Sequence, residues 1–221
     1  MSDVAHPGLA HHFESYEQQR QSASLGMWVF LAQEIMFFGG MFLAYMVYRS
    51  RYPLAFIAGS HHLDIGLGAF NTAVLIGSSL TMALGVRAAQ LGRRKAVVLF
   101  LILTLILGSI FLVVKYFEYS EKWDHHLIPG KHFHFEGEGK FAEVPQGPMQ
   151  IFFSLYFAMT GFHALHMIVG VILILYMLRP AWQGKYTPEN HNYVEGFGLY
   201  WHFVDIVWIF LFPLLYLIGR H

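Results

Sequence analysis

The chain has 221 residues, of which 56% are hydrophobic and only 13% charged, with 14 acidic and 14 basic side chains. Soluble domains carry about 25% charged residues, so this composition indicates a membrane protein, and the balanced charge creates no global field that would attract nucleic acid. The absence of cysteine excludes disulfides, iron–sulfur clusters, thiolate metal sites, covalent attachment of c-type haem and a thiolate-bridged copper centre.

Five segments are apolar over about 20 residues or more, the length that a helix needs to cross a membrane. We expect these spans at residues 25–48, 66–86, 96–114, 148–178 and 194–218. Only helices and closed barrels satisfy every backbone group in lipid. The sequence therefore predicts an all-α membrane protein, a five-helix bundle that forms one domain over residues 25–221.

Residues 1–24 are polar and rich in histidine, and we expect them to form a cytoplasmic N-terminal segment. Two interpretations of His6, His11 and His12 are open. They collect protons, because imidazole titrates near neutrality, or they belong to a disordered solubilising tail.

The second and third spans are joined by a tight basic turn, Gly92-Arg93-Arg94-Lys95. Short loops rich in Lys and Arg tend to stay in the cytoplasm, which predicts a cytoplasmic N-terminus and an outside C-terminus. The basic residues expected on the outer side, Lys115 and Lys122 among them, are about as numerous as those inside. The predicted orientation therefore rests on this one loop.

The first span contains a single ionisable residue, Glu34. A charge in a span is costly unless it is paired, and it suggests function by default. Glu34 is either a carboxylate that handles protons or lies beside lipid, or a protonated acid that hydrogen-bonds a neighbouring helix. In the second span, Asn71 and Thr72 can add hydrogen bonds between helices. Small residues at Gly39-Gly40 and Gly77-Ser78-Ser79 are typical of close helix contacts.

The fourth span carries His163 and His166, which lie three residues apart on one helical face. We expect both imidazoles to point into the bundle. The zinc arrangement with histidines four residues apart and an intervening Glu is absent here. The two histidines are therefore interpreted as hydrogen-bonded packing residues or as contacts for lipid head groups or protons.

The fifth span has a polar stripe, because Glu195, Gly198, His202 and Asp205 recur at helical spacing. A stripe of this kind must face other helices and not lipid. We expect Asp205 and His202 to pair on that face, which would offset the cost of burying the acid.

Five stretches, in order along the chain, resemble subunit III of cytochrome c oxidase. They are Gly26 to Phe42 around Glu34, Phe70-Asn71-Thr72-Ala73-Val74-Leu75, Lys115-Tyr116-Phe117-Glu118-Tyr119, Thr160-Gly161-Phe162-His163-Ala164-Leu165-His166, and Tyr200-Trp201-His202-Phe203-Val204-Asp205-Ile206-Val207-Trp208. The larger members of that family have seven helices, and this chain resembles the short bacterial form with five.

The resemblance implies an accessory subunit of a respiratory haem-copper oxidase in the bacterial inner membrane. Such a subunit packs against catalytic subunit I and subunit II, which hold the haem and copper. It binds no redox cofactor itself, binds phospholipid, supports proton uptake and protects the active site during turnover. The resemblance assigns Glu34 to a carbodiimide-reactive type of carboxylate. It matches a set of buried polar positions to Glu118, His163, His166, Glu195, His202 and Asp205.

Other functions remain open at this point. A catalytic subunit with two haems and copper needs about six helix-borne histidines, and this chain offers three, His163, His166 and His202. A related subunit of a quinol oxidase or nitric oxide reductase is possible, as is a proton-coupled transporter using Glu34 and Asp205, although no repeated halves are present. A last alternative is metal delivery by a loop containing His125, His126, His132, His134, Glu136 and Glu138.

Overall fold

The computed structural model describes residues 13–218 of the chain except 136 and 138. Over that part it contains six α-helices, and five of them are long and apolar enough to cross a membrane. The five are α1 (Tyr16–Arg51), α3 (Ile65–Gln90), α4 (Arg94–Asp124), α5 (Gln146–Trp182) and α6 (Asn192–Phe212), which continues into a π-helical turn, η2 (Pro213–Leu217). The short α2 (Pro53–His61) and the turn η1 (Gly139–Phe141) complete the described elements. The predicted all-α bundle with five helices of spanning length is confirmed.

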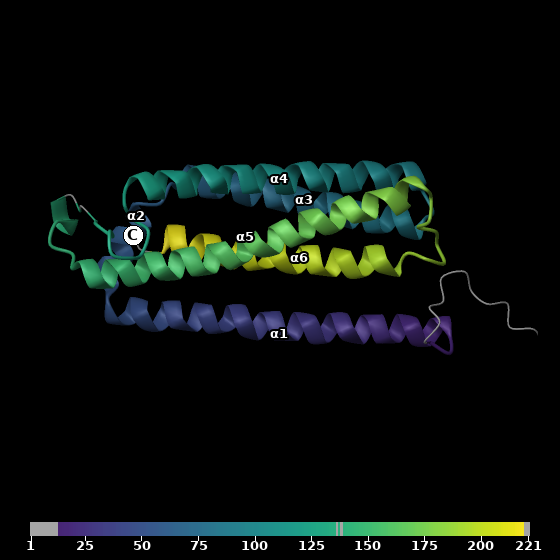
Figure 1. Ribbon diagram of the computed structural model, residues 1–221, viewed down its shortest axis with the longest axis horizontal. Helices are drawn as coiled ribbons and strands as arrows, with labels where there is room; N and C mark the ends of the chain where they lie inside the picture. Colours follow the sequence, from purple (N-terminus) through teal and green to yellow (C-terminus); the bar gives the residue numbers. More distant parts are fainter. Residues whose placement is uncertain (1–12, 136, 138, 219–221) are drawn as a thin grey trace, which may run out of the picture.

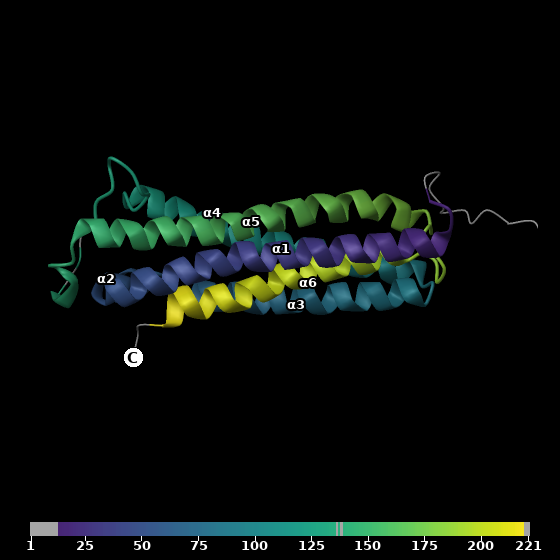
Figure 2. The same ribbon diagram turned by 90° about the horizontal axis from the view of Figure 1, so that it is seen from below.

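The long helices run side by side, so the bundle has two ends (Figures 1 and 2). The Gly92 end, on the right in Figure 1, holds the start of α1, the α3–α4 turn and the α5–α6 loop. The His125 end holds α2, the α4–α5 loop and η2. In the view of Figure 1, α1 lies apart from α3 and α4, with α5 and α6 between them.

The helices extend beyond the predicted spans. Helix α1 begins at Tyr16, well before residue 25, and the Ser15 hydroxyl caps it by accepting a hydrogen bond from the Gln18 amide at 3.2 Å. Helix α4 likewise continues to Asp124. Hydropathy marks only the turns suited to lipid, so it misses polar helical turns and the short α2. The first turns of α1 thus lie in the predicted N-terminal segment, whose His6, His11 and His12 fall outside the described residues.

Trp201 of α6 is the central packing residue of the bundle. Its buried ring lies against Gly108 of α4 and Gly170 of α5, where an added Cβ would come within 2.9 Å and 2.7 Å of ring atoms. The indole N–H donates to the Ser78 hydroxyl of α3 at 3.1 Å. Small residues therefore let four helices meet around one large ring, as close packing in lipid requires.

The contact predicted at Gly39-Gly40 is absent among the residues that the structure describes. A Cβ on either glycine would meet nothing within 4 Å. Helix α1 instead buries a different stripe, made of Leu31, Glu34, Phe38 and Tyr45. The larger side chains of this stripe fill the space toward α5 and α6, so α1 does not approach its neighbours through its glycines.

Substituting Gly170 with Ala should destabilise the bundle, because the new methyl group would overlap the Trp201 ring. Overpacking of this kind costs about 1–3 kcal/mol, measurable as a lower midpoint of thermal unfolding in detergent. Gly39→Ala is the matched control and should not lower the midpoint, because its methyl group meets open space. Equal midpoints for Gly170→Ala and wild type would show that Trp201 is not tightly packed.

Candidate functional site

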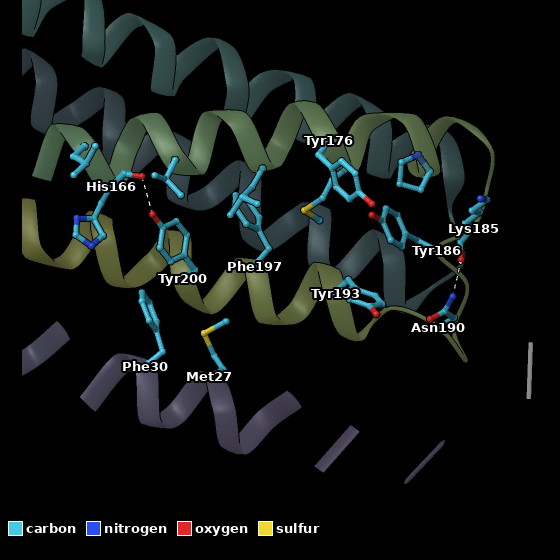
Figure 3. A pocket seen from close by; sticks show the side chains of 15 residues that line it. Met27, Phe30, His166, Tyr176, Lys185, Tyr186, Asn190, Tyr193, Phe197 and Tyr200 are labelled. Carbon is cyan, nitrogen blue, oxygen red and sulfur yellow. Dashed lines mark hydrogen bonds between the residues drawn. The ribbon is translucent and has the colours of Figure 1, made fainter. Parts of the chain in front are cut away.

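An elongated groove of about 840 Å³ separates α1 from α5 and α6 (Figure 3). We call it the α1 groove. Its polar groups are His166 toward one end and Lys185 and Asn190 at the Gly92 end, with tyrosine hydroxyls between them. The lining residues are Met27, Phe30, Leu165, His166, Val169, Leu173, Tyr176, Met177, Pro180, Lys185, Tyr186, Asn190, Tyr193, Phe197 and Tyr200. The groove is thus mainly apolar with a polar mouth.

Glu34 of α1 and His166 of α5 face each other beside this groove. His166 Nε2 lies 3.2 Å from Glu34 Oε2, without hydrogen-bond geometry. On the other side of the ring, Nδ1 lies 2.8 Å from the Phe162 carbonyl oxygen. A carbonyl only accepts, so Nδ1 carries a proton. The other ring nitrogen, Nε2, is the one that faces the Glu34 carboxyl group.

The walls of the pair come from aromatic side chains. The Tyr200 hydroxyl donates to the backbone oxygen of His166 at 2.8 Å, and Phe38 lies against the His166 ring with centroids 5.5 Å apart. Glu34 itself is only 8% exposed. The pair is therefore held in a fixed position and largely shielded. Of its two residues, His166 also lines the groove.

A second buried acid, Glu118 of α4, is fully paired. Lys115, one helical turn earlier, donates to Glu118 Oε2 at 2.9 Å, and Tyr156 of α5 donates to Oε1 at 2.7 Å. Tyr216 of η2 also donates to Oε1 and accepts from Lys115 at 2.8 Å. The Lys115 ammonium lies 4.6 Å from the ring centroid of Trp208, close enough for a cation–π contact. Glu118 is thus the centre of a closed structural network.

The role of Lys115 was not predicted from the sequence. Lys115 and Lys122 were expected among the basic residues of the outer side, and the structure buries both side chains, which are only 3% and 1% exposed. The spacing of Lys115 and Glu118, three residues apart on α4, was the signal that could have revealed the pair. Lys122 also lies 3.4 Å from a Glu121 carboxylate oxygen.

His163 and His166 do not share a site. His163 is fully buried between the rings of Phe111 and Trp208, at centroid distances of 5.2 Å and 5.1 Å, and neither ring nitrogen has a hydrogen-bond partner among the described residues. Three residues still separate the two side chains by roughly 60° around a helix, enough for them to face different neighbours. The prediction of two hydrogen-bonded packing histidines is thus wrong for His163.

Asn71 is also buried without a hydrogen-bond partner in the described part of the chain, contrary to its predicted role. The adjacent Thr72 makes the expected interhelical bond, because its hydroxyl accepts from the Trp208 indole at 3.0 Å. Thr72 therefore supplies one of the polar links between α3 and α6.

The polar stripe of α6 faces α3, as the sequence predicts. Gln90 donates to Glu195 Oε1 at 2.7 Å, and the Ser79 hydroxyl lies 2.7 Å from His202 Nδ1. Glu195 also lies 3.2 Å from His191 Nε2. The expected pairing of Asp205 with His202 is absent, because the neighbouring helix offers Ser79 to His202. Neither oxygen of Asp205 has a hydrogen-bond partner among the described residues.

Histidines also gather at the His125 end. His62 and His125 approach with ring centroids 6.2 Å apart. Burial lowers the pKa of His62, and the nearby Lys122 and His125 lower it further. Within the described residues, no three His, Asp or Glu side chains are placed to hold a metal ion. Glu136 and Glu138 of the proposed metal-delivery loop lie outside the described residues.

Lys115→Met should destabilise the protein strongly, because it leaves the Glu118 carboxylate buried without its cation. Breaking a buried pair costs about 3–5 kcal/mol, seen as a lower thermal midpoint in detergent. Adding Glu118→Gln to the same chain should recover much of the loss, since a neutral amide is less costly to bury. Lys95→Met, at an exposed position, is the control. A Lys115→Met protein as stable as wild type would refute the stabilising role.

Comparison with known proteins places the chain in a family. Residues 147–220 match the family model described as cytochrome c oxidase subunit III. The chain is 35% identical to cytochrome c oxidase subunit 3 of Corynebacterium diphtheriae over 88% of its length and 87% of that protein's. It is 35% identical to the same subunit of a Synechocystis species, covering 96% and 81%. With the subunit of Papio hamadryas, identity is 30% over 89% and 70%. The chain belongs to the cytochrome c oxidase subunit III family.

Proposed function

We propose that this chain is an accessory subunit of a bacterial cytochrome c oxidase, packed against subunits I and II, which hold the haem and copper. The relatives that it matches over most of their length are named as subunit 3 of that oxidase. The contacts of the helix-borne histidines support a role without a redox centre. His163 is enclosed by aromatic rings, His166 lies between Glu34 and the Phe162 carbonyl, and His202 bonds Ser79.

The proposed orientation places the Gly92 end in the cytoplasm and the His125 end outside the inner membrane. Arg93, Arg94 and Lys95 are all exposed at the Gly92 end, as the positive-inside rule requires. Lys115 and Lys122 are buried in the bundle, so they no longer count as basic residues of the outer side. Their removal from that count favours this orientation over the reverse.

The observation that supports a specific role is the Glu34–His166 pair, a carboxyl group and an imidazole 3.2 Å apart inside the bundle. Such a pair can hold a proton inside the membrane, where isolated ionisable groups are costly. His166 also lines one end of the α1 groove, whose other end lies at the Gly92 end of the bundle, the cytoplasmic end in the proposed orientation. We therefore assign Glu34 and His166 to support of proton uptake.

The α1 groove suits a phospholipid. Its apolar walls match an acyl chain, and Lys185 at its mouth can contact a phosphate, an electrostatic attraction that operates at the membrane surface. Asn190 and Tyr186 lie beside this lysine. Burial, with Tyr176 and Tyr193 nearby, raises the pKa of Tyr186 to about 12, so its hydroxyl stays protonated and can donate. A lipid here would also exclude water from the apolar face of α1.

Purification of the chain from native membranes in mild detergent tests this function. Haem a-type absorbance, together with a co-purifying catalytic subunit, is the expected result, and the partner that carries the donor site would distinguish cytochrome c from quinol. Phospholipid extracted from the same preparation should exceed that of a Leu173→Trp variant, which fills the groove. A solitary chain without haem absorbance would contradict the proposal and favour a transporter.

Glu34→Gln should leave the amount of assembled oxidase unchanged and lower its turnover, because a neutral amide cannot exchange a proton with His166. The decisive measurement is the pH dependence of turnover, in which the loss should be larger at high pH, where protons limit the rate. Glu17→Gln, at an exposed position of α1, is the control. Loss of the assembled complex in Glu34→Gln would give Glu34 a structural role.

A further inference from the structure

A surface pocket of about 560 Å³ lies where the start of α4 meets the end of α5, at the Gly92 end of the bundle (Figure 1). We call it the arginine pocket, because each of the two helices contributes a guanidinium group. Its lining residues are Arg94, Leu175, Leu178, Arg179, Trp182 and Gln183. The α1 groove is lined by other residues of α5, including Leu173 and Tyr176. At 3.6 residues per turn, the two sites lie on opposite faces of that helix.

The arginine pocket carries positive charge without a counter-charge. Arg94 and Arg179 are both exposed, and neither guanidinium group forms an ion pair or a hydrogen bond with a described residue. Arg93 and Lys95 flank Arg94, and the first turn of α4 contains no acidic residue. Charge of one sign gathered in a concave site attracts an ion of the opposite sign. The pocket is therefore suited to an anion.

Both arginines are presented by well-formed structure. The α5–α6 loop turns at Gly184 with a φ of 74°, and a Cβ added there would lie 3.3 Å from Arg94 Cδ. The aliphatic part of Arg94 thus packs against this turn. Arg179 is in the last turn of α5, where the helix dipole favours a cation. The two cations are therefore held at the pocket by a helix end and a packed turn.

The arginine pocket also changes from polar to apolar with depth in the membrane. Arg179 and Trp182 lie in the last turn of α5, whereas Leu175 lies about one turn nearer the middle, roughly 6 Å deeper at about 1.5 Å per residue. Leu175 is 53% exposed and Trp182 is 58% exposed. Tryptophan is typical of the membrane–water interface. Cations at the helix end with an exposed apolar surface below them match the head group and acyl chain of a phospholipid.

We propose that the arginine pocket binds an anionic phospholipid, such as phosphatidylglycerol, from the leaflet at the Gly92 end. Arg94 and Arg179 bind the phosphate, because guanidinium groups form strong charge-assisted hydrogen bonds with phosphate oxygens, and an acyl chain lies over Leu175. Basic pockets between membrane helices are known to hold anionic head groups. This inference goes beyond the proposed function, because it assigns a second lipid site on another face and makes its selectivity depend on head-group charge.

Photolabelling of the complex purified from native membranes tests this site. In phosphatidylcholine vesicles with a trace of photoactivatable phosphatidylglycerol, the peptide containing Trp182 should be labelled. Unlabelled phosphatidylglycerol should compete, and inorganic phosphate should not. The double variant Arg94→Gln, Arg179→Gln should reduce this labelling roughly tenfold, a factor equivalent to about 1.4 kcal/mol. Arg93→Gln removes an exposed charge that does not line the pocket, so this matched control should be labelled like wild type.

Several results would overturn the proposed lipid site. Equal labelling by a photoactivatable phosphatidylcholine would show that head-group charge is not selected. Competition by inorganic phosphate would show a phosphate site in place of a lipid site. Labelling that survives the double variant, or none at Trp182 because a partner subunit covers the pocket, would also refute it. None of these results bears on the proposed function, which is tested by co-purification of the haem-bearing subunit and by Leu173→Trp in the α1 groove.

Discussion

Lipid offers no hydrogen bonds, so the polar side chains within these helices must find partners in protein. The Lys115–Glu118 pair meets this requirement most fully. Its hydrogen bonds to Tyr156 and Tyr216 and its contact with the Trp208 ring join α4, α5, α6 and η2 at one place. Around that anchor, Trp201 can insert between glycines of α4 and α5. The position of the other polar groups follows from a bundle fixed in this way.

Helix α1 is attached differently, through polar contacts spaced along its length. Tyr16 donates to the Glu189 carbonyl at the Gly92 end, and Tyr45 donates to the Leu214 carbonyl toward the other end, both at 2.8 Å. Between them lies the Glu34–His166 contact at 3.2 Å. Since α1 is held at separated points, the α1 groove stays open beside it. The same arrangement therefore shapes the groove and positions the Glu34–His166 pair.

The sequence was sufficient for the number of long helices and for the face of α6, because hydropathy and helical spacing depend on local pattern. It was not sufficient to predict which buried side chains contact one another. Asp205 and His202 share a helical face, yet Ser79 of another helix takes His202. The burial of Lys115 was not predictable either, because its aromatic surroundings come from distant parts of the chain. The contact predicted at Gly39-Gly40 is also not found among the described residues, because α1 turns a face with larger side chains toward its neighbours.

Buried polar groups in this chain divide by where their partners lie. Glu118 is satisfied within the chain, Glu34 faces His166 without a hydrogen bond, and neither Asp205 oxygen has a hydrogen-bond partner among the described residues. A single-particle structure of the oxidase that contains this chain tests the proposed function most directly. The predicted result is a chain packed against a haem-bearing subunit, with Lys115 and Glu118 still paired at about 3 Å. A structure in which this chain contacts no haem-bearing subunit would contradict the proposed function.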